Sequence, residues 1–162
     1  MARSTGSTFP HAEGDYGLGA FYKSIGTILW GRKTYETALD FQKKGVPGAE
    51  FDTKVKNYVF TRSMAQSAAP PGVEFASETI KAFATRLRAE KGKDIWMMGG
   101  GGINASFLDE GEIDEFIINV IPTFIGEGIP LIAPRRRTVP LTLIFCSNFK
   151  DGVVNLHYAV DK

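Results

Sequence analysis

Apolar residues occur along this chain with two different spacings, which predict two kinds of element. Over the first two thirds, short apolar runs of strand length alternate with stretches in which apolar residues recur every three or four positions. Ile80, Phe83 and Leu87 follow this helical spacing. The pattern predicts strands at residues 27–30, 58–60, 73–75 and 94–98, and helices that begin near Asp15, Thr34, Ser77 and Asn104.

The last third of the chain contains only strand-like segments. Residues 113–121, 141–145 and 153–158 are apolar runs of strand length, and Asn155 and His157 alternate with apolar neighbours as in an antiparallel strand. The order predicts a single α/β domain over residues 1–162, a three-layer α/β/α fold. Its mixed sheet is expected to be parallel at the centre, with antiparallel C-terminal strands and helices on both faces. Residues 1–14, rich in Ser, Thr, Gly and Pro, are expected to be a flexible lead-in.

Composition and charge exclude several classes of function. The net charge of +1 argues against nucleic acid or a membrane surface as a partner, and no apolar run has membrane-spanning or leader length. His11 and His157 lie far apart without a Cys-x-x-Cys motif, which argues against a metal site. Cys146, the only cysteine, lies in an apolar run and is expected to be a buried thiol. We therefore expect a cytoplasmic protein with a small-molecule substrate.

Four consecutive glycines, residues 99–102, separate the apolar run 95–98 from a helix-like stretch. A turn without Cβ atoms allows a ligand to approach the main chain, and the following helix N-terminus offers unpaired N–H groups to an anion. The segment matches neither G-x-G-x-x-G nor a P-loop, because Ile103 and Asn104 follow the glycines. A phosphate-binding turn and a tight structural connection therefore both fit the pattern.

Two further strand ends carry residues that suit phosphate. Gly31, Arg32, Lys33 and Thr34 follow the first strand, where Thr34 could cap a helix and two cations reinforce its N-terminus. The next strand ends at Thr61, Arg62 and Ser63, whose hydroxyls and guanidinium suit a phosphate monoester. Each segment alone also fits an ordinary helix start or capped turn. If the strands are parallel, all three turns meet at one sheet edge, where a dinucleotide could bridge them.

Residues 29–36, 95–102 and 121–131, taken together, resemble motifs of the dihydrofolate reductase-like superfamily. The closer resemblance is to the branch that contains the C-terminal reductase domain of bacterial riboflavin biosynthesis. It implies an NADPH-dependent reductase that acts on a pterin or on a pyrimidine precursor of riboflavin. It also implies a homodimer formed through the C-terminal strands.

The resemblance assigns cofactor-binding roles to particular residues. It implies that Gly31, Arg32, Lys33 and Thr34 contact cofactor phosphates, and that Thr61, Arg62 and Ser63 hold the adenosine 2′-phosphate. It further implies that the glycine turn passes over the pyrophosphate, through Gly99, Gly100, Gly101, Gly102 and Ile103. Asn104 stands near the position where dihydrofolate reductases often carry a tyrosine that faces the nicotinamide.

The N-terminal residues depart from the family pattern. The family opens with a central apolar strand and a Ser-Leu-Asp-Gly-like turn, whereas residues 1–11 contain no apolar run and carry Pro10. We expect two neighbouring strands to lose a ladder partner. Asp15 is the candidate catalytic proton donor, with a plain helix N-cap as the alternative. The alternative is a nucleotide-binding member of the family that is catalytically impaired or truncated.

Overall fold

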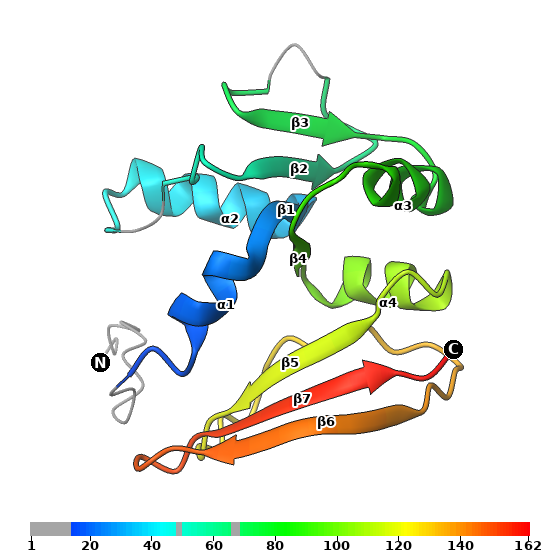
Figure 1. Ribbon diagram of the computed structural model, residues 1–162. Coiled ribbons are helices and arrows are strands. Elements are labelled where there is room, and N and C mark those ends of the chain that lie inside the picture. The colour runs from blue at the N-terminus through cyan, green and yellow to red at the C-terminus, as the bar shows by residue number, and fades with distance from the viewer. Residues whose placement is uncertain (1–13, 48–49, 66–68) are drawn as a thin grey trace.

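The computed structural model describes residues 14–47, 50–65 and 69–162, so the predicted lead-in at residues 1–14 lies almost wholly outside the described residues. Four strands form a parallel sheet in the order β3-β2-β1-β4 (Figure 1). The strands are β1 (Ile25–Gly31), β2 (Lys56–Phe60), β3 (Val73–Ala76) and β4 (Asp94–Met98). All four predicted strands of the first two thirds are confirmed, as is their parallel pairing.

Four helices are connected to this sheet: α1 (Leu18–Ser24), α2 (Arg32–Lys43), α3 (Ile80–Ala89) and α4 (Gly101–Asp109). Two of them begin earlier than the sequence predicted. Helix α2 starts directly after Gly31, so Thr34 lies within the helix and does not cap it. Helix α4 starts at Gly101, three residues before Asn104, because extended glycine backbone leads straight from strand to helix.

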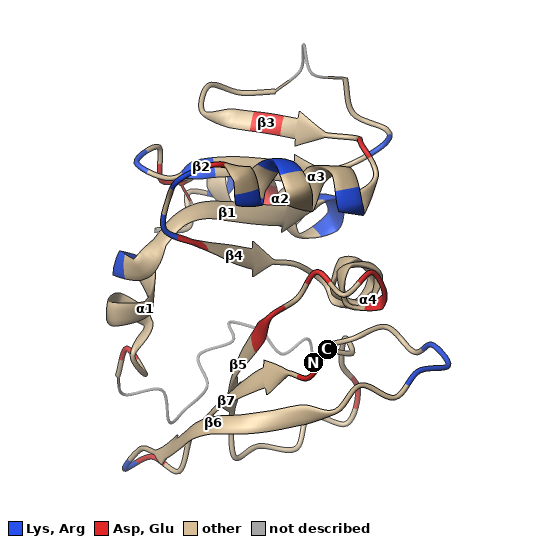
Figure 2. Cartoon of the chain, turned by 45° about the vertical axis from the view of Figure 1, so that its right-hand side comes forward, with Lys and Arg blue, Asp and Glu red and all other residues tan. Residues whose placement is uncertain are grey.

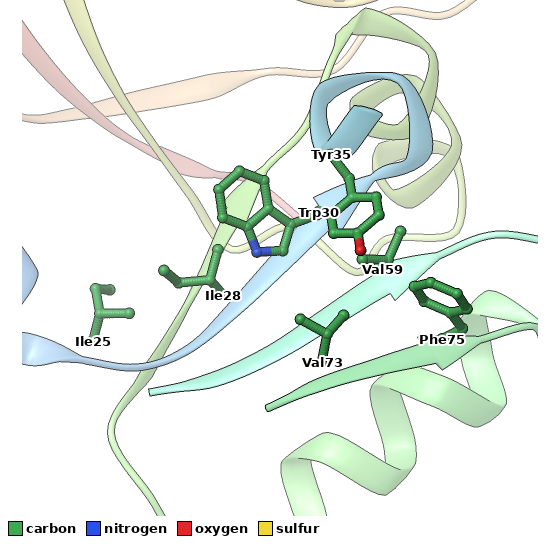
Figure 3. Close-up of a cluster of buried hydrophobic side chains, with 7 residues drawn as sticks. All are labelled: Ile25, Ile28, Trp30, Tyr35, Val59, Val73 and Phe75. Carbon is green, nitrogen blue, oxygen red and sulfur yellow. The ribbon is translucent and has the colours of Figure 1, made fainter. Parts of the chain in front are cut away.

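Two apolar clusters, one on each face of the parallel sheet, form the core. On one face, Ile28 and Trp30 of β1 pack with Tyr35 of α2 (Figure 3). The aromatic residues of α1 pack against the same cluster. On the other face, Leu29 packs with Phe83 of α3 and Phe107 of α4. Alternate β1 residues thus face opposite helical layers, as the period of two in a strand requires. This confirms the predicted three-layer arrangement.

The C-terminal third forms a separate antiparallel sheet. Its strands are β5 (Glu115–Val120), β6 (Leu141–Asn148) and β7 (Val154–Val160), in the order β5-β7-β6. Within the described ranges, no strand pairing joins β5 to β4, so the parallel and antiparallel parts are two sheets rather than one continuous mixed sheet. Figures 1 and 2 both show β5 on the side of its sheet nearest the parallel strands. β4 and β5 are thus edge strands on the sides where the two sheets approach each other, and neither has a ladder partner there among the described residues.

The antiparallel sheet is less covered than its apolar sequence suggested. Leu143 and Phe145 of β6 are 52% and 57% exposed, and Cys146 is exposed as well. The prediction of a buried Cys146 thiol is therefore wrong: among the described residues, no helix covers β6 as α3 covers β2. None of the helices in the described part of the chain has the length and apolarity needed to cross a membrane.

Candidate functional site

A cavity of about 690 Å³ lies at the carboxyl ends of the parallel strands. Because β1, β2 and β3 run parallel, the turns that follow them reach the same edge of the sheet. The cavity is lined by residues from the turns after β1, β2 and β3 and from helix α4: Gly31, Arg32, Phe60, Thr61, Arg62, Ser77, Glu78, Thr79, Ile80, Lys81, Gly102, Ile103, Ser106 and Glu110. The volume suits a cofactor-sized ligand.

The structure brings six of the predicted cofactor-binding residues to this cavity. They come from all three predicted turns: Gly31, Arg32, Thr61, Arg62, Gly102 and Ile103. The others lie beside these residues without lining the cavity: Lys33, Thr34, Ser63, Gly99, Gly100 and Gly101. Thr34 Oγ1 lies 3.7 Å from the position of a Cβ atom on Gly100, so the first and third turns are close to each other.

The glycines of the turn after β4 differ in what surrounds them. A Cβ atom on Gly99 would lie 2.3 Å from Asn104 Oδ1, and one on Gly101 would lie 2.4 Å from the carbonyl oxygen of Pro130. Gly102, in contrast, has no atom within 4 Å of its Cβ position and lines the cavity. Close packing within the protein therefore requires glycine at 99 and 101, while Gly102 leaves its main chain open to a ligand.

Two helices begin at this end of the sheet without a capping side chain. Gly31 and Gly100 are the N-cap residues of α2 and α4, and neither has a side chain to accept a hydrogen bond from the first turn. Helix α3 is different, because Thr79 Oγ1 accepts a hydrogen bond from Ala82 N at 3.3 Å. The first N–H groups of α2 and α4 thus lack a side-chain acceptor and carry partial positive charge.

The charged side chains that line the cavity are paired, with one exception among the described residues. Arg32 pairs with Glu36 at 2.7 Å, Lys81 with Glu110 at 3.6 Å, and Glu78 with Arg86 at 2.8 Å. The exposed side chain of Arg62 has no hydrogen bond or salt bridge in the described part of the chain. The cavity therefore holds an uncompensated cation in the turn after β2.

Thr61 is buried at the base of this turn. Its Oγ1 accepts a hydrogen bond from Ser63 N at 3.3 Å and lies 3.4 Å from Ser63 Oγ. The Thr61 hydroxyl thus shapes the turn that presents Arg62, while Ser63 is exposed. The two alternatives for this segment, capped turn and anion contact, are compatible in the structure.

Asp15 is not among the residues that line the cavity. Its carboxylate accepts hydrogen bonds from the main-chain N–H groups of Gly17 and Gly19, at 3.0 and 3.2 Å, at the start of α1. The neighbouring Tyr16 packs against Phe149, next to the β6–β7 connection. The N-cap residue of α1 is Gly17 rather than Asp15, but the Asp15 carboxylate accepts hydrogen bonds at this helix start, which favours a structural role over that of a proton donor at the cavity.

One wall of the cavity was missed by the sequence analysis. Ser77, Glu78, Thr79, Ile80 and Lys81 form the turn after β3 and the first turn of α3. The sequence does contain an indication of this wall: the segment follows a predicted strand, and the ends of parallel strands reach the same edge of the sheet. The sequence pattern predicts only a helix start there, because the segment contains no glycine.

With this geometry established, comparison with known proteins identifies the family. The sequence model of the RibD C-terminal domain matches residues 21–154. The chain belongs to the RibD C-terminal domain family. Members of this family are NADPH-dependent reductases. The match covers the whole parallel sheet, strands β5 and β6, and every turn of the cavity.

Two proteins of Bacillus subtilis strain 168 are similar to this RibD C-terminal domain protein along most of its length. YwjB, an uncharacterized protein, is 40% identical over 146 residues, which cover 90% of this chain and 80% of YwjB. YyaP, also uncharacterized, is 31% identical over 150 residues, covering 89% of this chain and 79% of YyaP.

Solved structures share the fold at lower identity. A putative riboflavin biosynthesis protein from Shewanella sp. PV-4 superposes with a TM-score of 0.77 at 21% identity, covering 93% of this chain and 82% of that one. A pyrimidine reductase-like protein from Corynebacterium diphtheriae superposes with a TM-score of 0.65 at 16% identity, covering 99% of this chain and 87% of that one. RibD of Acinetobacter baumannii superposes with a TM-score of 0.64 at 15% identity, covering 92% of this chain and 51% of RibD. The dihydrofolate reductase-like fold is thereby confirmed.

Proposed function

We propose that this protein binds NADPH in the cavity at the ends of β1, β2 and β3 and is a reductase of a pterin or of a pyrimidine precursor of riboflavin. The observation that carries the proposal is that one cavity brings together two helix N-termini without a capping side chain and Arg62, which has no ionic partner among the described residues. NADPH has a pyrophosphate and a 2′-phosphate, so it offers anionic groups to both features. Family membership supports the same cofactor.

Different residues of the cavity would bind different phosphate groups of the cofactor. The N-terminal N–H groups of α2 and α4 suit the pyrophosphate, with Gly102 allowing close approach to the main chain. Arg62, with the hydroxyl of Ser63 beside it, suits the 2′-phosphate. NADPH, when bound, supplies hydride to a polarised C=N or C=O carbon.

A second candidate function is nucleotide binding without efficient reduction. Glu78 and Glu110, the carboxylates that line the cavity, are each engaged by a cation. Asp15 lies elsewhere, and the facing edges of β4 and β5 are unpaired in the described chain. These features favour a protein that binds the phosphates of a nucleotide but has no proton donor positioned at the cavity among the described residues.

The decisive experiment titrates the purified protein with NADPH and NADH, followed by nicotinamide fluorescence and thermal shift. We expect a preference for NADPH, and we expect Arg62→Ala to weaken NADPH binding by about tenfold or more while changing NADH binding little. Lys54→Ala, which removes an exposed cation outside the cavity, is the matched control. Equal losses for both cofactors in Arg62→Ala would exclude the 2′-phosphate role.

Turnover separates the two candidate functions. Consumption of NADPH on addition of dihydrofolate or of an aminouracil that carries a ribosyl phosphate would support the reductase. Tight NADPH binding without consumption for either substrate class would support the binding protein.

We also propose that two copies associate through the C-terminal sheet in the cytoplasm. Leu141 and Leu143 of β6 pair with Val160 and Tyr158 of β7, so the apolar side chains share one face of the sheet. Leu141 and Leu143 are exposed there, and Phe124, Ile125 and Ile129 in the segment after β5 are also exposed. A second copy of the chain could bury this apolar surface.

A further inference from the structure

Arg86 lies outside the cavity but controls the charge of one of its walls. Its Nε donates a hydrogen bond to Glu78 Oε1 at 2.8 Å, and its Nη2 donates to Glu74 Oε1 at 3.2 Å. Glu78 lines the cavity that also holds Arg62. The carboxylate of Glu78 would otherwise present an unpaired negative charge to any phosphate bound by Arg62.

The guanidinium of Arg86 is held in place by aromatic rings as well as by carboxylates. Its Cζ lies 5.3 Å from the centroid of Tyr58 and 5.2 Å from that of Phe83. Both distances are within the range of cation–π contacts. The hydrogen bond to Glu78 raises the pKa of Arg86 further above its usual value, so the guanidinium stays charged throughout the working pH range. The rings and Glu74 thus hold a permanent cation against Glu78.

We infer that Arg86 is a positioning residue for cofactor choice: by neutralising and orienting Glu78, it permits a 2′-phosphate in the cavity. The inference rests on the proposed function. A free carboxylate at such a wall repels a phosphate monoester and can instead accept hydrogen bonds from ribose hydroxyls. Removal of the Arg86 charge would therefore shift the preference of the site from 2′-phosphorylated towards unphosphorylated adenosine.

The test measures dissociation constants for 2′,5′-ADP and 5′-AMP by calorimetry on the folded protein. For Arg86→Gln we expect the affinity for 2′,5′-ADP to fall about tenfold, with a change of less than about threefold for 5′-AMP. Addition of Glu78→Gln to Arg86→Gln should restore the preference, because the exposed carboxylate is then gone. Arg86→Lys, which keeps the charge, should stay close to the unmodified protein.

Arg88→Gln is the matched control. Arg88 lies on the same helix but pairs with Glu112 and with Asp114, neither of which lines the cavity. We expect its ratio of 2′,5′-ADP to 5′-AMP affinity to be unchanged. Should Arg86→Gln fail to fold, the single variant Glu78→Gln provides the test. We expect it to raise the affinity for 2′,5′-ADP about two- to threefold, because it removes one negative charge that repels the phosphate.

The outcomes are distinct. Failure of the unmodified protein to bind either nucleotide would refute the proposed function and this inference with it. Preferential binding of 2′,5′-ADP by the unmodified protein, with the same preference in Arg86→Gln, would overturn the inference alone. Equal weakening of both nucleotides, or no rescue by Glu78→Gln, would assign Arg86 a purely structural role.

Discussion

The indole N–H of Trp30 donates a hydrogen bond to the side-chain oxygen of Asn57, with 3.0 Å between the two atoms. Both residues are buried, and they lie on the neighbouring strands β1 and β2. The Asn57 amide nitrogen donates to the carbonyl oxygens of Asp52 and Val55, at 2.9 and 3.0 Å. One side chain thus satisfies three polar groups, one buried and two partly buried, and connects the chain before β2 to the centre of the sheet.

Substitution of Asn57 should therefore be costly. Asn57→Ala leaves the Trp30 N–H and two carbonyl oxygens without partners, and we expect a loss of about 2–4 kcal/mol in the free energy of unfolding. Urea unfolding followed by tryptophan fluorescence measures it. Asn155→Ala, which removes an exposed hydrogen bond to Asn119, should cost less than about 1 kcal/mol. Equal losses in the two variants would contradict the argument.

In the alkaline range, the free energy of unfolding should decrease with rising pH, in part because of the Tyr35 phenol. Burial raises the pKa of the Tyr35 phenol above its usual value of 10.0. The unfolded chain then loses this proton at lower pH than the folded protein does. The contribution of the phenol is fully present below about pH 10 and declines as the pH rises towards the folded pKa.

Tyr35→Phe isolates this contribution. The variant cannot ionise at this position, so its free energy of unfolding should fall less steeply between about pH 10 and pH 11 than that of the unmodified protein. Parallel urea titrations across that range measure both slopes. Identical slopes would show that Tyr35 does not contribute to the alkaline loss of stability.

Much of the fold could be predicted because local sequence and tertiary structure agree. Short apolar runs bounded by Gly31, by Thr61 and by the glycines after Met98 became parallel strands, and parallel pairing alone then placed their ends together. The starts of α2 and α4 were misplaced because the sequence criteria looked for a capping side chain. Gly31 and Gly100 begin these helices without one.

Other features depend on tertiary context that a single sequence does not encode locally. Cys146 is exposed because no helix in the described part of the chain covers β6, which its apolar neighbours in the sequence could not reveal. The wall of the cavity formed by Glu78 has no glycine turn that would mark it in the sequence, so only the structure shows that Glu78 lines the cavity and pairs with Arg86. Asp15 was a reasonable candidate by position, but only the structure shows its carboxylate engaged by Gly17 and Gly19.

The proposed self-association can be tested on the exposed face of β6. Leu143→Glu places a charge where the second copy would bury an apolar side chain, so we expect a dimer to dissociate to monomers. Sedimentation velocity over a range of protein concentrations measures this. Phe41→Glu, an exposed apolar residue of α2 on the other sheet, should leave the dimer intact. A monomeric unmodified protein at high concentration would refute the proposal.

Gly101 and Gly102 form a pair of adjacent positions at which the same substitution should have opposite effects. A Cβ atom on Gly101 would collide with the carbonyl oxygen of Pro130 at 2.4 Å and would lie 3.1 Å from Ala133 N. The same segment is tied to the helix by a hydrogen bond from Ala133 N to Gly101 O, at 2.9 Å. We therefore expect Gly101→Ala to lower the free energy of unfolding by about 1–3 kcal/mol.

Gly102→Ala should instead leave the fold intact or stabilise it by up to about 1 kcal/mol, because alanine favours the helix and nothing lies within 4 Å of the new methyl group. The methyl group would project into the cavity, so NADPH affinity should fall by about fivefold or more if the cofactor approaches the main chain there. Thermal unfolding and NADPH titration of both variants separate the two effects. Unchanged affinity in Gly102→Ala would mean that no ligand passes over this glycine, whereas unchanged stability in Gly101→Ala would mean that the segment around Pro130 moves aside freely.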